Sequence, residues 1–262
     1  MNGRKTIVGG LRKMEIRAII FDLGGTLIEY AGPYAVWPDL ETPGFEAVFV
    51  SLQGKGVKLP SFAEFRDTGF AILPGRWQMA IKGERNLRLL DFLAEVLAVC
   101  HVNSVEEAWL EEAANLYQDA ICAQAVPLEA ANETLDFVKG RGYKMGLLSN
   151  TMFTAAAHVS DLQRFALDGY FDAMLFSADA GKWKPSADPY LDLLDQLQVA
   201  PENGIFVGDD PANDIVGGQR AGLRTILLRS SQRFSQPDGV YPDAVIGHLS
   251  ELPIVLANWS NE

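Results

Sequence analysis

Short apolar runs that end in polar residues recur along most of the chain. The runs lie at residues 16–22, 143–148, 173–176, 205–207 and 225–228, and residues 245–246 can add a short edge strand. Amphipathic stretches of helical length lie between them, at about 132–139, 154–165, 188–198 and 213–220. Strands that alternate with helices predict crossover connections and a mainly parallel α/β sheet with both faces covered.

Residues 30–130 break this alternation, and their pattern predicts mainly helices. Two Ser-x-x-Glu pairs, Ser61 with Glu64 and Ser104 with Glu107, have the spacing of a capping box at a helix start. The insertion comes directly after the first predicted strand. We therefore expect a Rossmann-like core from residues 14–29 and 131–262, and a helical cap domain from residues 30–130.

The first 13 residues are expected to form a loose N-terminal extension. They carry four basic residues and no acid, and they lack the apolar stretch of about 7 to 15 residues that a signal peptide requires. Met14 directly precedes the first predicted strand, which makes it a candidate for the natural start.

Composition and charge narrow the class of protein. The formal net charge of -12 disfavours a nucleic-acid partner and an anionic membrane surface, because both attract cationic proteins. No apolar run approaches the length of a membrane-spanning helix. With Cys100 and Cys122 alone, neither a disulfide scaffold nor a thiolate zinc site is expected, and a reduced cytoplasmic setting is the default.

Polar residues follow three of the predicted strands. Asp22 opens the segment Asp-Leu-Gly-Gly-Thr, Ser149 and Asn150 follow the second strand, and Asp209, Asp210 and Asp214 come after the fourth. Parallel strands place such ends at one edge of the sheet, where ligands bind. Alone, the first two motifs could cap a turn or a helix. Three acids within six residues indicate a nearby cation, because like charges repel.

In this order, together with Lys184 before Pro185, the motifs resemble those of the haloacid dehalogenase-like hydrolase superfamily. The resemblance covers nearly all of residues 15–255. It implies a Rossmann-like core with a cap, and in most members a magnesium-dependent phosphoryl transfer. A small phosphorylated metabolite is then the expected partner, and the protein is expected to be a monomer or a homodimer.

The resemblance also implies roles for individual residues. Asp22 matches the nucleophile that forms an aspartyl-phosphate, and Lys184 matches the lysine that neutralises charge, with Lys182 as a nearby competitor. The implied substrate-binding residues are Thr26, Ser149, Asn150 and Lys184. Among them, Ser149 and the backbone N–H of Asn150 would hold the phosphoryl oxygens. The implied Mg²⁺ ligands are Asp22, the backbone carbonyl of Gly24, Asp209 and Asp214, and the adjacent Asp210 could assist.

Gly24 is where the chain departs from the family pattern. Most family phosphatases carry a second aspartate there, which protonates the leaving group and later activates water. Losing a general acid–base group costs about 100- to 10,000-fold in rate. The substitution therefore predicts slow hydrolysis of ordinary alkyl phosphates, and less impairment for substrates with a good leaving group.

Alternatives to a phosphatase stay open at this point. A degenerate member could bind a phosphometabolite or a protein without efficient turnover, and dehalogenases and phosphonatases of the family also lack the second aspartate. In the cap, Arg76 and Trp77 could face the substrate, as an arginine for an anion and a ring for stacking. A surface arginine beside a buried tryptophan would produce the same pair.

Overall fold

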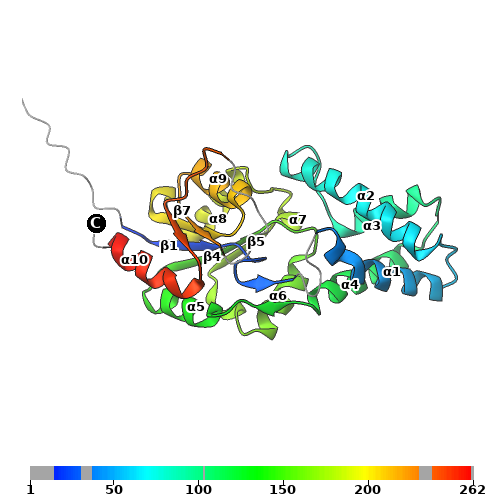
Figure 1. Cartoon of the computed structure of the whole chain (residues 1–262), viewed down its shortest axis with the longest axis horizontal. Coiled ribbons are helices and arrows are strands. Elements are labelled where there is room, and N and C mark those ends of the chain that lie inside the picture. The colour runs from blue at the N-terminus through cyan, green and yellow to red at the C-terminus, as the bar shows by residue number, and fades with distance from the viewer. Residues whose placement is uncertain (1–14, 31–36, 103, 230–237, 261–262) are drawn as a thin grey trace, which may run out of the picture.

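The fold is described from a computed structural model, which covers residues 15–30, 37–102, 104–229 and 238–260. The expected N-terminal extension and the candidate start at Met14 lie outside these residues. A sheet with helices on both faces and a separate group of helices lie side by side along the long axis of the molecule (Figure 1).

Within the described residues, six strands form one sheet in the order β5-β4-β1-β6-β7-β8, and all neighbours pair in parallel. The strands are β1 (Ala18–Phe21), β4 (Lys144–Ser149), β5 (Ala173–Phe176), β6 (Gly204–Gly208), β7 (Arg224–Leu228) and β8 (Ala244–Ile246). The expected parallel α/β core is therefore confirmed, including its short edge strand. Strand β1 is central and pairs with β4 on one side and β6 on the other.

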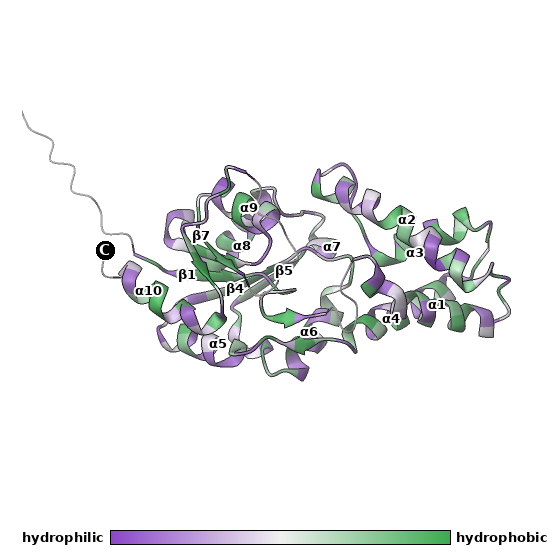
Figure 2. Cartoon of the chain, in the orientation of Figure 1, coloured by the Kyte–Doolittle hydropathy of each residue, from purple (hydrophilic) through white to green (hydrophobic). Residues whose placement is uncertain are grey.

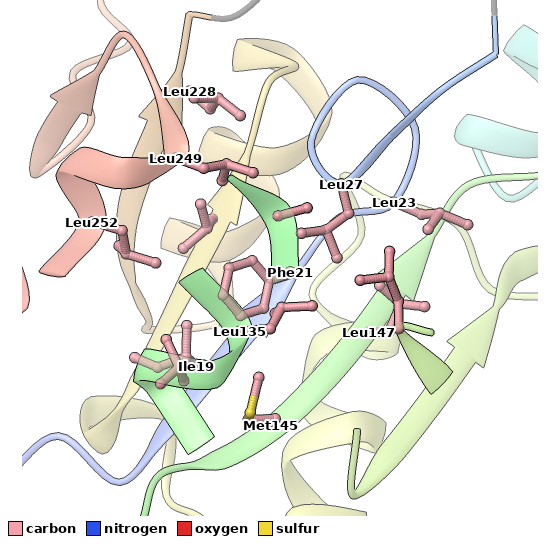
Figure 3. Packing of buried hydrophobic residues seen from close by; sticks show 14 of the residues in the cluster. Ile19, Phe21, Leu23, Leu27, Leu135, Met145, Leu147, Leu228, Leu249 and Leu252 are labelled. Atoms are coloured by element: carbon pink, nitrogen blue, oxygen red, sulfur yellow. The ribbon is translucent and has the colours of Figure 1, made fainter. Parts of the chain in front are cut away.

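Alternating residues of β1 build two separate apolar layers, as the two-residue period of a strand requires. Ile19 and Phe21 pack with Leu135 of α5 and Leu252 of α10 (Figure 3). The opposite layer contains Ile20 and is covered by α8. Figure 2 shows largely hydrophobic strands between helices of mixed hydropathy. The core helices are α5 (Ala131–Gly140), α6 (Ala155–Arg164), α7 (Ser177–Ala180), α8 (Asp188–Leu197), α9 (Val216–Arg220) and α10 (Leu252–Ser260).

Within the described residues, the insertion contains four α-helices that share one apolar cluster. They are α1 (Thr42–Gly54), α2 (Phe62–Ile81), α3 (Leu89–Val99) and α4 (Glu107–Cys122). Phe45 lies at the centre of this core, with Phe65, Phe92 and Tyr117 edge-on around its ring. A two-stranded antiparallel ribbon of β2 (Ile28–Glu29) and β3 (Val126–Pro127) carries the chain into and out of the cap.

Short helical turns complete the described structure. Four are 3-10 turns, and the fifth is a π turn that lies directly before α9. Their bounds are Asp39–Glu41, Asp168–Tyr170, Pro201–Asn203, Leu249–Glu251 and, for the π turn, Pro211–Ile215. None of the described helices is both long and apolar enough to cross a membrane.

The capping predictions had mixed outcomes. The Ser61 hydroxyl accepts a hydrogen bond from the backbone N–H of Glu64, so the first capping box is confirmed in this half. The second prediction is wrong, because α4 begins at Glu107 after Glu106 and has no side-chain cap. Ser104 therefore lies too far upstream to serve as its N-cap residue.

A buried carboxyl group lies at the start of the cap. Glu41 accepts a hydrogen bond of 2.9 Å from the hydroxyl of Tyr117, and both side chains are buried. Burial raises the pKa of Glu41 to about 7, although the hydrogen bonds from Tyr117 and Trp37 lower it. Because the unfolded chain releases this proton at lower pH than the folded cap, the protein loses stability as the pH rises through 7.

We predict that Glu41→Gln will weaken this pH dependence. Between pH 5 and 8 the wild type should lose about 2 to 3 kcal/mol of stability that the variant keeps, because the amide cannot ionise. Urea unfolding at several pH values measures the difference. Glu46→Gln, on the exposed side of α1, is the matched control and should follow the wild type. Parallel profiles for the wild type and Glu41→Gln would contradict the prediction.

Candidate functional site

Three of the predicted motifs meet at the carboxyl ends of adjacent strands. Asp22 follows β1 directly, Ser149 ends the neighbouring β4, and Asp209 follows β6 on the other side. All three side chains are buried. The strand order therefore brings together residues that are more than 180 positions apart in the sequence.

Lys184 extends into this group from the loop before α8. Its Nζ lies 2.5 Å from Oδ1 of Asp22 and 2.7 Å from Oδ1 of Asp214. Burial by itself would lower the pKa of Lys184, but the carboxylates of Asp214 and Asp22 outweigh burial and raise it. The lysine therefore stays protonated between the two acids.

The structure distinguishes between the two candidate lysines. Lys182 pairs instead with Asp192 on the surface of the core. Lys184 is held by Asn150, whose side chain donates to the carbonyl of Lys184 at 2.9 Å and accepts from its N–H at 2.8 Å. The side chain of Asn150 thus positions the lysine, a contribution that sequence reasoning missed because the two residues are 34 positions apart.

Asp22, Asp209 and Asp214 form a compact cluster of buried carboxylates. One oxygen from each lies within 4.8 Å of the others. Burial is the main cause that raises the pKa of Asp209, and the neighbouring carboxylates of Asp22 and Asp214 raise it further. Burial also raises the pKa of Asp214, against the lowering effect of Lys184. Within the described part of the chain, the one buried ammonium group is that of Lys184, and it pairs with two of these three acids.

Asp209 shows most directly that the cluster fits a cation. Its Oδ2 is buried and has no hydrogen-bond partner among the residues that the structure describes. Gly25 lies against it in a left-handed backbone conformation, and a Cβ at Gly25 would stand 2.3 Å from that oxygen. An unpartnered carboxylate oxygen is costly to bury, and clustered hard oxygens are the donor set that Mg²⁺ prefers.

The two acids in the turn after β6 have different roles. Asp210 caps the turn, and its carboxylate accepts from the backbone of Ala212 and Asn213 and from the side chain of Asn213. The backbone N–H of Asp210 donates to Oδ2 of Asp214 at 3.0 Å, which fixes that carboxylate. The expected helix over 213–220 starts only at Val216, because a π turn precedes it and carries Asp214.

The remaining predicted residues lie in two different places. The Thr26 hydroxyl, in the loop after β1, is buried and finds no hydrogen-bond partner in the described ranges of the chain. Gly24 lies in the same loop, and its backbone bridges to Ile28. Arg76 belongs to the cap, where its guanidinium pairs with Glu95 and also contacts Met79. The hydrogen bonds of Arg76 therefore go to cap residues and not to the strand-end cluster.

Trp183, next to the lysine, joins the core to the cap. Its indole N–H donates to Asn86 of the cap at 2.9 Å, and its ring packs edge-on against Trp77 at 5.0 Å. Met152 and Phe153, from the loop after β4, belong to the same apolar cluster as the cap helices. The cap is thus packed against the loop that carries Lys184 and the loop that follows Ser149.

Comparisons with known proteins agree with this arrangement. The chain is 32% identical over 154 residues to the pyrimidine 5'-nucleotidase YjjG of Escherichia coli, a match that covers 58% of this chain and 65% of that protein. It is 32% identical over 125 residues to the phosphoglycolate phosphatase of Aquifex aeolicus, with 48% and 56% covered. The chain thus spans less than two thirds of the length of these relatives.

The fold is also that of a solved structure. A 2-haloacid dehalogenase from Pseudomonas syringae superposes with a TM-score of 0.70 at 24% sequence identity, covering 93% of this chain and 99% of that one. The family model of the haloacid dehalogenase-like hydrolases matches residues 16–222. The chain therefore belongs to the haloacid dehalogenase-like hydrolases.

Proposed function

We propose that this hydrolase is a magnesium-dependent phosphatase that acts on a small organophosphate through an aspartyl-phosphate at Asp22. The observation that carries the proposal is the single buried ammonium of Lys184 among three buried carboxylates, one of which has an unpartnered oxygen. Two relatives that bear phosphatase or nucleotidase names are consistent with this reaction class.

The nucleophile would be oriented by its neighbour. Lys184 holds one oxygen of the Asp22 carboxylate, which leaves the other free to attack phosphorus. A bond forms between that oxygen and phosphorus, and the bond from phosphorus to the leaving oxygen breaks with its electron pair. Water then hydrolyses the aspartyl-phosphate, which releases phosphate and restores the carboxylate.

Charge compensation at the phosphoryl group comes from several directions. Ser149 and the backbone N–H of Asn150 would hold the phosphoryl oxygens, and Lys184 would neutralise part of their charge. Asp22, Asp209, Asp214 and the carbonyl of Gly24 would hold Mg²⁺. When bound, the ion supplies positive charge that lets an anionic nucleophile approach an anionic phosphate.

Gly24 shapes the proposed substrate class. A glycine cannot protonate a leaving oxygen, so phosphates with acidic leaving groups should react fastest. The position would accept a side chain, because the nearest atom to an added Cβ is a ring carbon of Tyr30 at 3.8 Å, which is ordinary contact. The same glycine supports a second candidate function, a protein that binds a phosphometabolite without efficient turnover.

Turnover should depend completely on the divalent cation and on Asp22. We expect phosphate release from p-nitrophenyl phosphate or acetyl phosphate in the presence of MgCl₂, and its loss on chelation with EDTA. Asp22→Asn should lower kcat by at least about 1,000-fold, because an amide is not a competent nucleophile. Full activity of this variant would show that Asp22 is not the nucleophile.

A second prediction concerns magnesium binding, measured by thermal unfolding without a substrate. Asp209→Asn should raise the melting temperature without magnesium by roughly 2–6 °C, because it removes a buried acid that ionises more readily in the unfolded chain than in the folded site, at a cost of about 1–2 kcal/mol. The variant should also lose the stabilisation that MgCl₂ gives the wild type in thermal unfolding. Asp210→Ser, which can still cap the turn, should keep the magnesium response. An equal response in Asp209→Asn would contradict the assignment of Asp209.

Restoring the missing acid separates the two candidate functions. Gly24→Asp should increase the hydrolysis of an alkyl phosphate such as glycerol 3-phosphate by about 10-fold or more, and that of p-nitrophenyl phosphate by less. Gly169→Asp adds the same charge at an exposed site of the core with open space around it, and it should change neither rate. A folded Gly24→Asp variant without any gain would favour the binding protein over the phosphatase.

A further inference from the structure

Helix α6 contacts both chain segments that connect the core with the cap. At the first connection, the ring nitrogen Nδ1 of His158 lies 3.2 Å from the hydroxyl of Tyr30, directly after β2. At the second, Arg164 donates to the carbonyl of Cys122 at 2.6 Å, where α4 ends. One core helix thus holds the chain where it enters the cap and where it leaves it.

His158 is also bonded to the loop that follows β4. Its Nε2 lies 2.7 Å from the hydroxyl of Thr151, two residues after Ser149. The imidazole is buried and stacked between the rings of Phe153 and Phe176. Burial lowers the pKa of His158 to about 4, so the ring stays neutral at physiological pH. A neutral imidazole offers one donor and one acceptor.

The partners determine which nitrogen carries the proton. The Thr151 hydroxyl oxygen already accepts a hydrogen bond from the N–H of Phe153 at 3.0 Å. The Thr151 hydroxyl donates its proton to Nε2 of His158, because a buried hydroxyl proton without an acceptor would be costly. The imidazole proton then lies on Nδ1 and is donated to the oxygen of Tyr30. The chain of hydrogen bonds therefore runs from Thr151 through His158 to Tyr30.

Tyr30 anchors the far end of this chain. Burial, followed by the nearby Asp161 carboxylate, raises the pKa of Tyr30 well above its ordinary value, so its hydroxyl stays protonated. Its ring borders the space that a side chain at position 24 would occupy. One tyrosine thus lies against the nucleophile loop, the first cap connection and, through His158, the loop of Ser149.

We propose that Tyr30 and His158 are positioning residues that hold the loop of Ser149 and Asn150 in its working geometry while the cap connection is seated on the core. The inference rests on the proposed function for its substrate chemistry. The Thr151 backbone is already held by Ser177, whose hydroxyl accepts from its N–H and donates to its carbonyl. Tyr30 and His158 supply the additional link, from this loop to the cap.

Tyr30→Phe tests the proposal with little change in packing, because the ring remains and only the hydroxyl is lost. We expect KM for p-nitrophenyl phosphate to rise about 5- to 10-fold, with a smaller fall in kcat. The affinity for inorganic phosphate in the presence of MgCl₂ should fall by a similar factor in calorimetry. Tyr170→Phe is the matched control, because it removes a tyrosine hydroxyl that donates to the exposed Asp136. The control should change each value less than 2-fold.

One result would overturn the inference: a Tyr30→Phe variant whose KM and phosphate affinity both match those of Tyr170→Phe. The calorimetric affinity for inorganic phosphate needs no turnover. It therefore decides the inference even if the wild type releases no phosphate, a result that would refute the proposed function instead.

Discussion

The ammonium group of Lys184 holds two buried carboxylates, those of Asp22 and Asp214, from one side of the site. Three acids with one oxygen of each within 4.8 Å of the others would repel and take up protons if no cation were close. The lysine offsets part of this repulsion and leaves Asp209 with an uncompensated oxygen. This charge imbalance is the basis of the proposed cation site and of the proposed phosphoryl transfer.

The surrounding fold buries this cluster and fixes the relative positions of its residues. Parallel pairing of β1 with β4 and β6 aligns the strand ends, and Asn150 fastens the lysine loop to the end of β4. The acidic surface of the protein, with a net charge of -12, cannot draw in an anion. Attraction for the proposed phosphorylated substrate must therefore be local, within the site.

Much of this site could be predicted from sequence because it follows from strand ends. Asp22 directly follows one apolar run, and Ser149 lies at the end of another. Parallel pairing then places both residues at the same edge of the sheet. The choice between Lys182 and Lys184 could not be made, because it depends on Asn150, a partner distant in sequence. The His158 contacts were equally inaccessible, since no local pattern marks a histidine whose partners come from three separate segments.

Burial of Trp183 stabilises the arrangement in which the cap is packed against the core. Its side chain is 3% exposed and lies within the apolar cluster of the cap helices. Swinging the cap away would return this indole to water at a cost of roughly 2 kcal/mol or more. A form with the indole exposed would then be a minority of about a few per cent. Ligand entry through such a minor form would lower the association rate by about that fraction and leave the equilibrium affinity of the closed site unchanged.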